Sequence, residues 1–169
     1  IASTIILLAS FTVLTSAGIK QLGVEKVERY DSKIQEGQTL IFNGDYEMAV
    51  YSFNEAIKIM PKKSEGYINI AKMYFQIGEY DECINYLEGE ALLKEPSLYK
   101  DADCLYILGS SYYKKEEYSS AITRFEKAVT LNPTSVNYLR DLAVSYARNE
   151  SIEKAKETLE KLSNEKAQE

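Results

Sequence analysis

Apolar residues recur at helical spacing along most of this chain. Between residues 102 and 133 they fall three or four positions apart, beginning at Leu105 and Leu108. That spacing gathers apolar side chains on one face of a helix. Pro133 closes the second run, because proline lacks the backbone N–H that would extend a helix. The pattern predicts two helices, over about 102–115 and 118–131, that pack against each other as a hairpin.

The same pattern occurs in four copies. Equivalent residues lie 34 positions apart within each pair of copies, from Leu105 to Leu139 in the later pair and from Tyr46 to Tyr80 in the earlier pair. The interval from Tyr80 to Tyr118, which joins the two pairs, is longer by four positions. The extra positions are therefore inserted between the second and third copies, within Gly89 to Asp101. The predicted first helices cover 30–43, 64–77, 102–115 and 136–148, and the second helices cover 46–60, 80–94, 118–131 and 152–166.

The residues of the third copy follow a known order. They are Leu105, Leu108, Gly109, Tyr112, Tyr118, Ala121, Phe125, Ala128 and Pro133. This order resembles the tetratricopeptide repeat (TPR), a helix-turn-helix unit whose hairpins recur at the same interval. The resemblance implies an all-α, right-handed α-solenoid of four helix-turn-helix hairpins, and the apolar residues at the N-terminus predict a preceding apolar helix. The repeats would occupy residues 30–63, 64–97, 102–135 and 136–169.

Residues 1–19 form a different kind of sequence. They hold no charge and no proline, and as a helix they would be about 28 Å long, enough to cross a bilayer. We expect a transmembrane or signal-anchor helix, followed by a linker helix over residues 20–29. Two alternatives are the apolar region of a signal peptide, with a cleavage-like Thr15-Ser16-Ala17, and a buried core helix.

An anchor of this kind predicts a single-pass membrane location. Lys20, Lys26 and Arg29 follow the apolar segment, which by the positive-inside rule would place the repeats in the cytoplasm. An anchor that leads straight into a folded domain is instead the usual layout of translocated domains. The side of the membrane therefore stays open, and the layout favours the extracytoplasmic one.

Composition narrows the classes of function. The chain is 45% apolar and 27% charged, its formal net charge is −6, and it contains no histidine. The negative charge and the lack of a basic run argue against a nucleic-acid partner. Without histidine or a glycine-rich phosphate loop, we predict no enzyme activity, no catalytic residues, no cofactor and no small-molecule substrate. Cys83 and Cys104 are too few for a zinc site, so no metal is predicted, and both are expected to be core thiols.

The remaining candidate site is a groove. The resemblance implies that the first helices line a concave surface that binds a protein or peptide segment. The predicted protein-binding residues are Ile68, Lys72, Phe75, Tyr106, Ser110, Tyr113 and Arg140. Family members that clamp the carboxylate of chaperone C-termini use a set of basic residues and asparagines, of which only Asn69 matches here. The sequence therefore argues against binding of chaperone tails.

Two functions follow from these features. In the first, the chain is a non-enzymatic TPR scaffold for protein–protein interaction that residues 1–19 tether to a membrane. In the second, it is the sensory or docking C-terminal domain of a larger membrane-anchored enzyme, similar in layout to bacterial Ser/Thr kinases that carry such repeats. The residues upstream of Ile1 would distinguish the two.

Overall fold

The computed structural model describes the backbone of residues 2–166 and the side chains of residues 19–163. Every regular element of this described part is helical, as the apolar spacing predicts. The chain divides into two compact units, Ile1–Pro61 (unit 1) and Lys62–Glu169 (unit 2).

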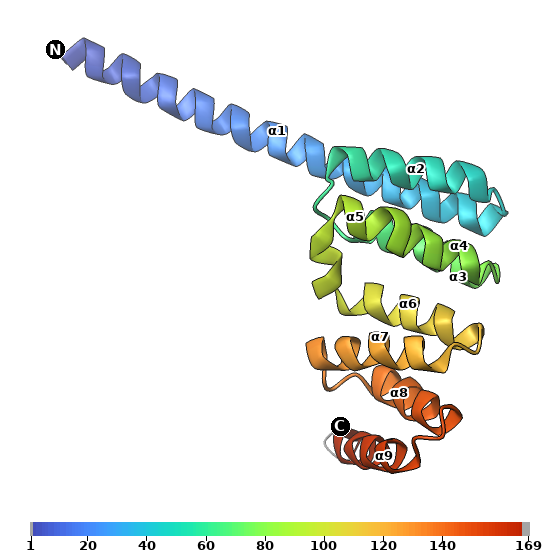
Figure 1. Cartoon of the computed structure of the whole chain (residues 1–169). Coiled ribbons are helices and arrows are strands. Elements are labelled where there is room, and N and C mark those ends of the chain that lie inside the picture. The colour runs from blue at the N-terminus through green and yellow to red at the C-terminus, as the bar shows by residue number, and fades with distance from the viewer. Residues whose placement is uncertain (1, 167–169) are drawn as a thin grey trace. The chain divides into compact units, whose positions relative to one another are not determined.

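Unit 1 is a hairpin of two helices, α1 (Ala2–Asn43) and α2 (Tyr46–Ile59). Tyr30 of α1 is fully buried, and Phe53 of α2 is fully buried in contact with α1 at Gly37. Gly37 allows this contact, since a Cβ at that position would lie 2.5 Å from the Phe53 ring. Only the second half of α1 packs on α2, and residues 19–29 are exposed (Figure 1).

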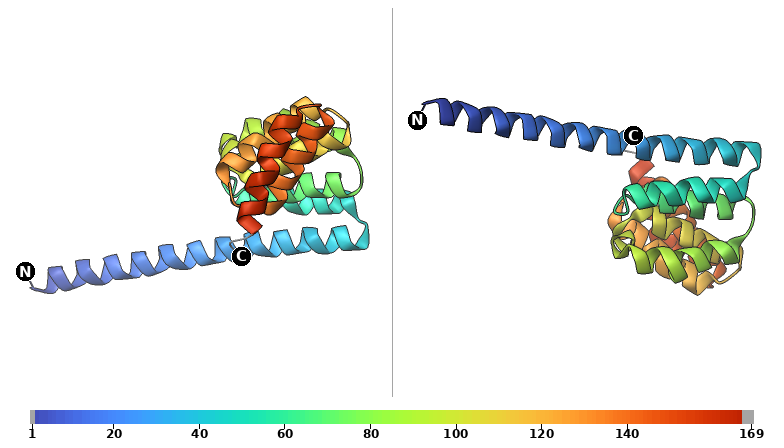
Figure 2. Two further views of the ribbon diagram at one scale, coloured as in Figure 1. Left: turned by 90° about the horizontal axis from the view of Figure 1, so that it is seen from below. Right: turned by 90° about the horizontal axis from the view of Figure 1, so that it is seen from above.

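Helix α1 includes both the predicted linker and the first helix of the first predicted repeat. Residues 20–29 were expected to continue as a linker helix into the first repeat, and the backbone runs as one helix from Ala2 to Asn43 (Figure 2). A glycine weakens a helix by about 1 kcal/mol without ending it, and α1 continues through Gly23. The side chains of residues 1–18, which make up nearly all of the predicted anchor, lie outside the described part.

The predicted single-pass membrane location is also wrong on the described residues. No helix among them combines the length and the apolar character that a bilayer crossing requires. The described part of α1 carries the charged residues Lys20, Glu25 and Lys26, all of them solvent-exposed.

Unit 2 contains three successive hairpins (Figure 1). Its first helices are α3 (Glu65–Gln76), α6 (Ala102–Lys114) and α8 (Val136–Arg148). Their partners are α4 (Tyr80–Tyr86), α7 (Tyr118–Leu131) and α9 (Ile152–Lys166). The predicted bounds of the α6–α7 hairpin differ from these by no more than one residue.

The predicted insertion takes the form of two unusual turns. Helix α4 continues into a π-helical turn, η1 (Leu87–Ala91), then into the short α5 (Leu92–Lys94). A 3-10 helix, η2 (Pro96–Lys100), follows and leads into α6. Leu98, at the centre of η2, is fully buried, so the inserted segment packs against the rest of unit 2.

The hairpin turns adopt left-handed backbone conformations. Gly44 and Gly78 have φ angles of 85° and 84°. The corresponding residues of the later hairpins, Glu116 and Glu150, adopt 63° and 59° although each carries a Cβ. A left-handed residue that is not glycine costs about 1–2 kcal/mol, so packing of the flanking helices holds these two turns in place.

The core of unit 2 follows the repeat positions. Phe125 is 1% exposed and packs with Leu142 and Tyr146 of the next hairpin. Both cysteines are buried free thiols, as predicted. Burial raises the pKa of the Cys104 thiol to about 12, so it stays protonated at neutral pH.

The last helix is less polar on its outside than its alternating Glu and Lys residues suggest. Leu159 occupies the repeat position of Phe125, yet it is 50% exposed, because no described helix packs over α9 from that side. Ile152, two turns earlier on α9, is 51% exposed.

Candidate protein-binding groove

A cavity of about 630 Å³ opens on unit 2 along the three first helices. Helix α3 contributes residues from its second half, α6 contributes residues along its whole length, and α8 contributes residues from its first two thirds. The lining residues are Lys72, Phe75, Gln76, Asp103, Tyr106, Ile107, Ser110, Tyr113, Lys114, Phe125, Asn137, Tyr138, Asp141 and Val144. We call this cavity the groove.

Aromatic rings form much of the groove wall. Tyr106 stacks on Tyr138 with ring centroids 4.6 Å apart, and it also contacts Phe125 at 5.5 Å. At the other end of the groove Phe75 packs on Tyr80, and Tyr113 packs in the same way on Tyr118. These contacts hold the rings in fixed positions, so the groove wall is largely preformed.

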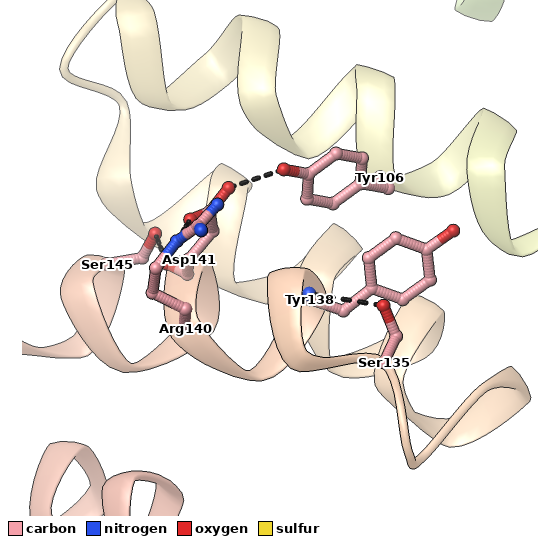
Figure 3. Close-up of polar contacts among 6 residues, drawn as sticks. All are labelled: Tyr106, Ser135, Tyr138, Arg140, Asp141 and Ser145. Carbon is pink, nitrogen blue, oxygen red and sulfur yellow. Dashed lines mark hydrogen bonds and ion pairs between the residues drawn. The ribbon is translucent and has the colours of Figure 1, made fainter. Parts of the chain in front are cut away.

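Two hydrogen bonds join α6 to α8 across the groove. The Tyr106 hydroxyl donates to Asp141 Oδ2 at 2.5 Å, and the Tyr138 hydroxyl donates to Asp103 (Figure 3 shows both tyrosines). Each helix thus supplies one tyrosine and one aspartate. Both bonds join residues at the same sequence separation, so α6 and α8 lie parallel and in one register.

Asp141 has a second partner. The Arg140 Nε donates to Asp141 Oδ1 at 2.8 Å, which leaves each carboxylate oxygen with one donor (Figure 3). The Ser145 hydroxyl donates to the backbone carbonyl of Asp141 and ties it to the next turn. The carboxylate is therefore fixed in position at the edge of the groove.

Burial and these bonds shift the tyrosine pKa values upward. Desolvation, followed by the bond to Asp141, raises the pKa of Tyr106 to about 12. The pKa of Tyr138 is raised for the same two reasons, with Asp103 as the acceptor. Both hydroxyls are therefore protonated donors throughout the physiological range.

The charges of the groove are unevenly distributed. Asp103 lies in the first turn of α6, whereas Lys114 is its last helical residue. Lys72 faces the groove from the second half of α3. Neither lysine forms an ion pair with any residue that the structure describes, in contrast to Lys115, which pairs with Asp81 at 2.5 Å.

The structure brings together five of the seven residues predicted from sequence. The groove is lined by Lys72, Phe75, Tyr106, Ser110 and Tyr113. Ile68 is instead buried, with 7% of its surface exposed, and Arg140 lies beside the groove through its pairing with Asp141. A binding role for these residues stays a prediction.

Several residues that line the groove were not predicted from the sequence. Asp103, Asn137 and Asp141 were not among the predicted groove residues, although they lie on the same first helices. Their signal was available in principle, because residues 103 and 137 occupy the same position of successive repeats. Tyr138 was missed because its role depends on the rotation of α8 against α6.

Comparison with known sequences agrees with this geometry. A model of the tetratricopeptide repeat matches residues 30–63 and 64–89, and a second model, described as TPR repeat, matches residues 109–150. The chain belongs to the tetratricopeptide repeat family. TPR proteins mediate protein–protein interaction and are typically non-enzymatic. The matches break off across the inserted turns that follow residue 89.

Two curated relatives are TPR proteins from distant organisms. The TPR repeat-containing protein MJ1428 of Methanocaldococcus jannaschii is 25% identical over an alignment that covers 76% of this chain and 30% of that protein. The TPR repeat-containing protein YpiA of Bacillus subtilis is 29% identical over 117 residues, which cover 69% and 27%. The chain thus spans less than a third of either relative.

Solved structures of MamA show a similar fold. MamA from Desulfovibrio magneticus RS-1 matches with a TM-score of 0.67 and 25% identity, over 83% of this chain and 77% of that one. A further crystal structure of MamA matches with a TM-score of 0.68 and 19% identity, over 88% and 85%. These structures support an all-α helical repeat fold.

Proposed function

We propose that this chain is a non-enzymatic interaction module that binds an extended segment of a partner protein in the groove. The observation that supports this most directly is the groove itself. About 630 Å³ of space lies along α3, α6 and α8, and it is lined by rings that their neighbours hold in place. Large rigid side chains in a preformed concavity are typical of residues that dominate binding energy.

Tyr113 is the best residue with which to test this proposal. It lines the groove, and its ring packs on Tyr118 and against the core cluster that contains Phe125. Tyr106, in contrast, also bonds Asp141 and stacks on Tyr138, so its removal would loosen the α6–α8 contact as well. A binding defect in a Tyr113 variant is therefore easier to interpret.

The experiment begins with a photo-crosslinking amino acid at Ser110, which lies in the groove, and at Glu157, which is exposed on α9. A partner segment captured from Ser110 and not from Glu157 is then made as a peptide. We expect Tyr113→Ala to weaken its binding by about 1–3 kcal/mol while helicity is retained, and Glu157→Ala to bind normally. Equal capture at both positions, or normal binding by Tyr113→Ala, would contradict the proposal.

A further inference from the structure

The groove has two electrically different ends. Asp103 and Lys114 lie on the same helix, eleven residues apart, which corresponds to about 16 Å along its axis. Lys72 adds a second positive charge on the side of Lys114. It occupies the position of α3 that corresponds to Ser110 of α6, and Ser110 is nearer in sequence to Lys114 than to Asp103. The groove therefore runs from an acidic end at the start of α6 to a basic end at its close.

The two ends also differ in how their charges are satisfied. At the acidic end, Asp103 accepts a bond from Tyr138, and Asp141 accepts one from Tyr106 and one from Arg140. At the basic end, Lys72 and Lys114 have no ion pair with a described residue, although Lys115, next in sequence, has two. Unpaired charges that already face a cavity can bind a ligand without first giving up an internal partner.

We infer that the groove binds a charge-asymmetric peptide segment in one orientation, with its acidic residues over Lys72 and Lys114 and its basic residue toward Asp103. This inference rests on the proposed function and adds the chemistry and direction of the partner. A span of about 16 Å corresponds to about five residues of extended chain, so the opposite charges of the segment are separated by about that number. The reverse orientation places like charges opposite each other at both ends, which disfavours it.

The test uses the full chain and a designed probe. The probe is an end-blocked peptide of nine residues, with two glutamates at one end, two lysines at the other, and Phe and Leu among the five residues between them. A matched probe replaces the four charged residues by glutamine. Each carries a nitroxide label at one end or the other, and broadening of backbone NMR signals reports which end of α6 the label approaches.

We expect the charged probe to bind about tenfold more tightly than the glutamine probe. Its glutamate end should broaden Tyr113 and Lys114, and its lysine end should broaden Asp103 and Asn137. Reversing the basic charges in Lys72→Glu with Lys114→Glu should abolish the tenfold advantage. Lys127→Glu, an exposed lysine of α7 outside the groove, should leave it unchanged.

The outcomes separate the inference from the proposed function. If both probes broaden groove signals, but the labelled ends show no preference or the lysine reversal has no effect, the orientation inference is overturned and groove binding stands. If neither probe at millimolar concentration broadens any groove signal, groove binding and the orientation are both overturned. Broadening confined to the outer helices overturns them as well.

Discussion

Gly109 allows close packing of α6 and α7 because it has no Cβ. A Cβ there would lie 2.8 Å from the Phe125 ring and 3.2 Å from Arg124 Cβ. Real Cβ contacts are essentially never as short as 2.8 Å, so helix α7 approaches α6 this closely because the side chain is absent. Gly37 and Phe53 repeat the arrangement in unit 1.

Gly109→Ala should therefore destabilise unit 2, although alanine is the better helix former. We expect a loss of about 1–3 kcal/mol in the free energy of unfolding, because the added methyl group displaces Phe125 from its packing position. Urea denaturation followed by circular dichroism measures this. Gly89→Ala is the control, since a Cβ there meets nothing within 4 Å. A Gly109→Ala protein as stable as its parent would show that α7 shifts freely away from α6.

At the scale of elements, the π-helical turn places the Glu88 side chain within hydrogen-bonding distance of two other side chains. Glu88 accepts a bond from Arg124 Nη2 at 2.6 Å and another from the Tyr112 hydroxyl at 2.8 Å. Arg124 and Glu88 have 22% and 31% of their side chains exposed, so the pair is partly shielded from water. The π-helical turn is thereby connected to both α6 and α7.

Glu88→Gln should weaken this connection. We expect a loss of about 1–3 kcal/mol in unfolding free energy, because an amide cannot pair with the guanidinium charge and one partner is left unsatisfied. Glu90→Gln, two residues on, is the matched control. Glu90 pairs with Lys94 across an exposed helix surface, where such pairs contribute less than about 1 kcal/mol. Similar losses in the two variants, measured in urea, would show that the Glu88 bonds contribute nothing particular.

Much of this element structure could be predicted from sequence, and the exceptions have physical causes. Helix α7 was predicted over 118–131, its observed extent, because apolar spacing and the hairpin turns mark its ends. The π-helical turn at Leu87–Ala91 leaves no comparable signal, since the same residues could continue an α-helix. The lining of the groove was predicted in part, whereas the Tyr106–Asp141 bond depends on how two helices of successive repeats rotate, which periodicity does not specify.

Across the molecule, buried tyrosines should make stability depend on alkaline pH. The pKa values of Tyr106 and Tyr112 are raised to about 12, first by burial and then by bonds to Asp141 and Glu88. In the unfolded chain a tyrosine pKa is about 10. Between these values the folded protein holds more protons than the unfolded one, so stability present below pH 10 is lost as the pH rises toward 12.

We therefore expect helicity to fall, and tyrosinate absorbance at 295 nm to rise, together and steeply between about pH 10 and 12. Tyr106→Phe removes one of the shifted groups and should make the pH dependence shallower. Gradual ionisation of all the tyrosines near pH 10, with helicity intact, would be inconsistent with their hydroxyls being buried donors. The chain has no tryptophan, so its fourteen tyrosines are well suited to this measurement.

The paired bonds between α6 and α8 bear on the order in which the repeats open. In repeat proteins each unit contacts only its neighbours, so terminal units tend to exchange their amide hydrogens first. Tyr106 and Tyr138 join the first helices of the last two hairpins directly, without passing through α7. Among the described helices, α8 is thus joined to both α6 and α7, whereas α9 packs chiefly on α8. The amide hydrogens of α9 can therefore exchange while those of α8 stay protected by the bonds to α6. The boundary between the segment that opens first and the segment that stays folded then lies between α8 and α9, inside one repeat.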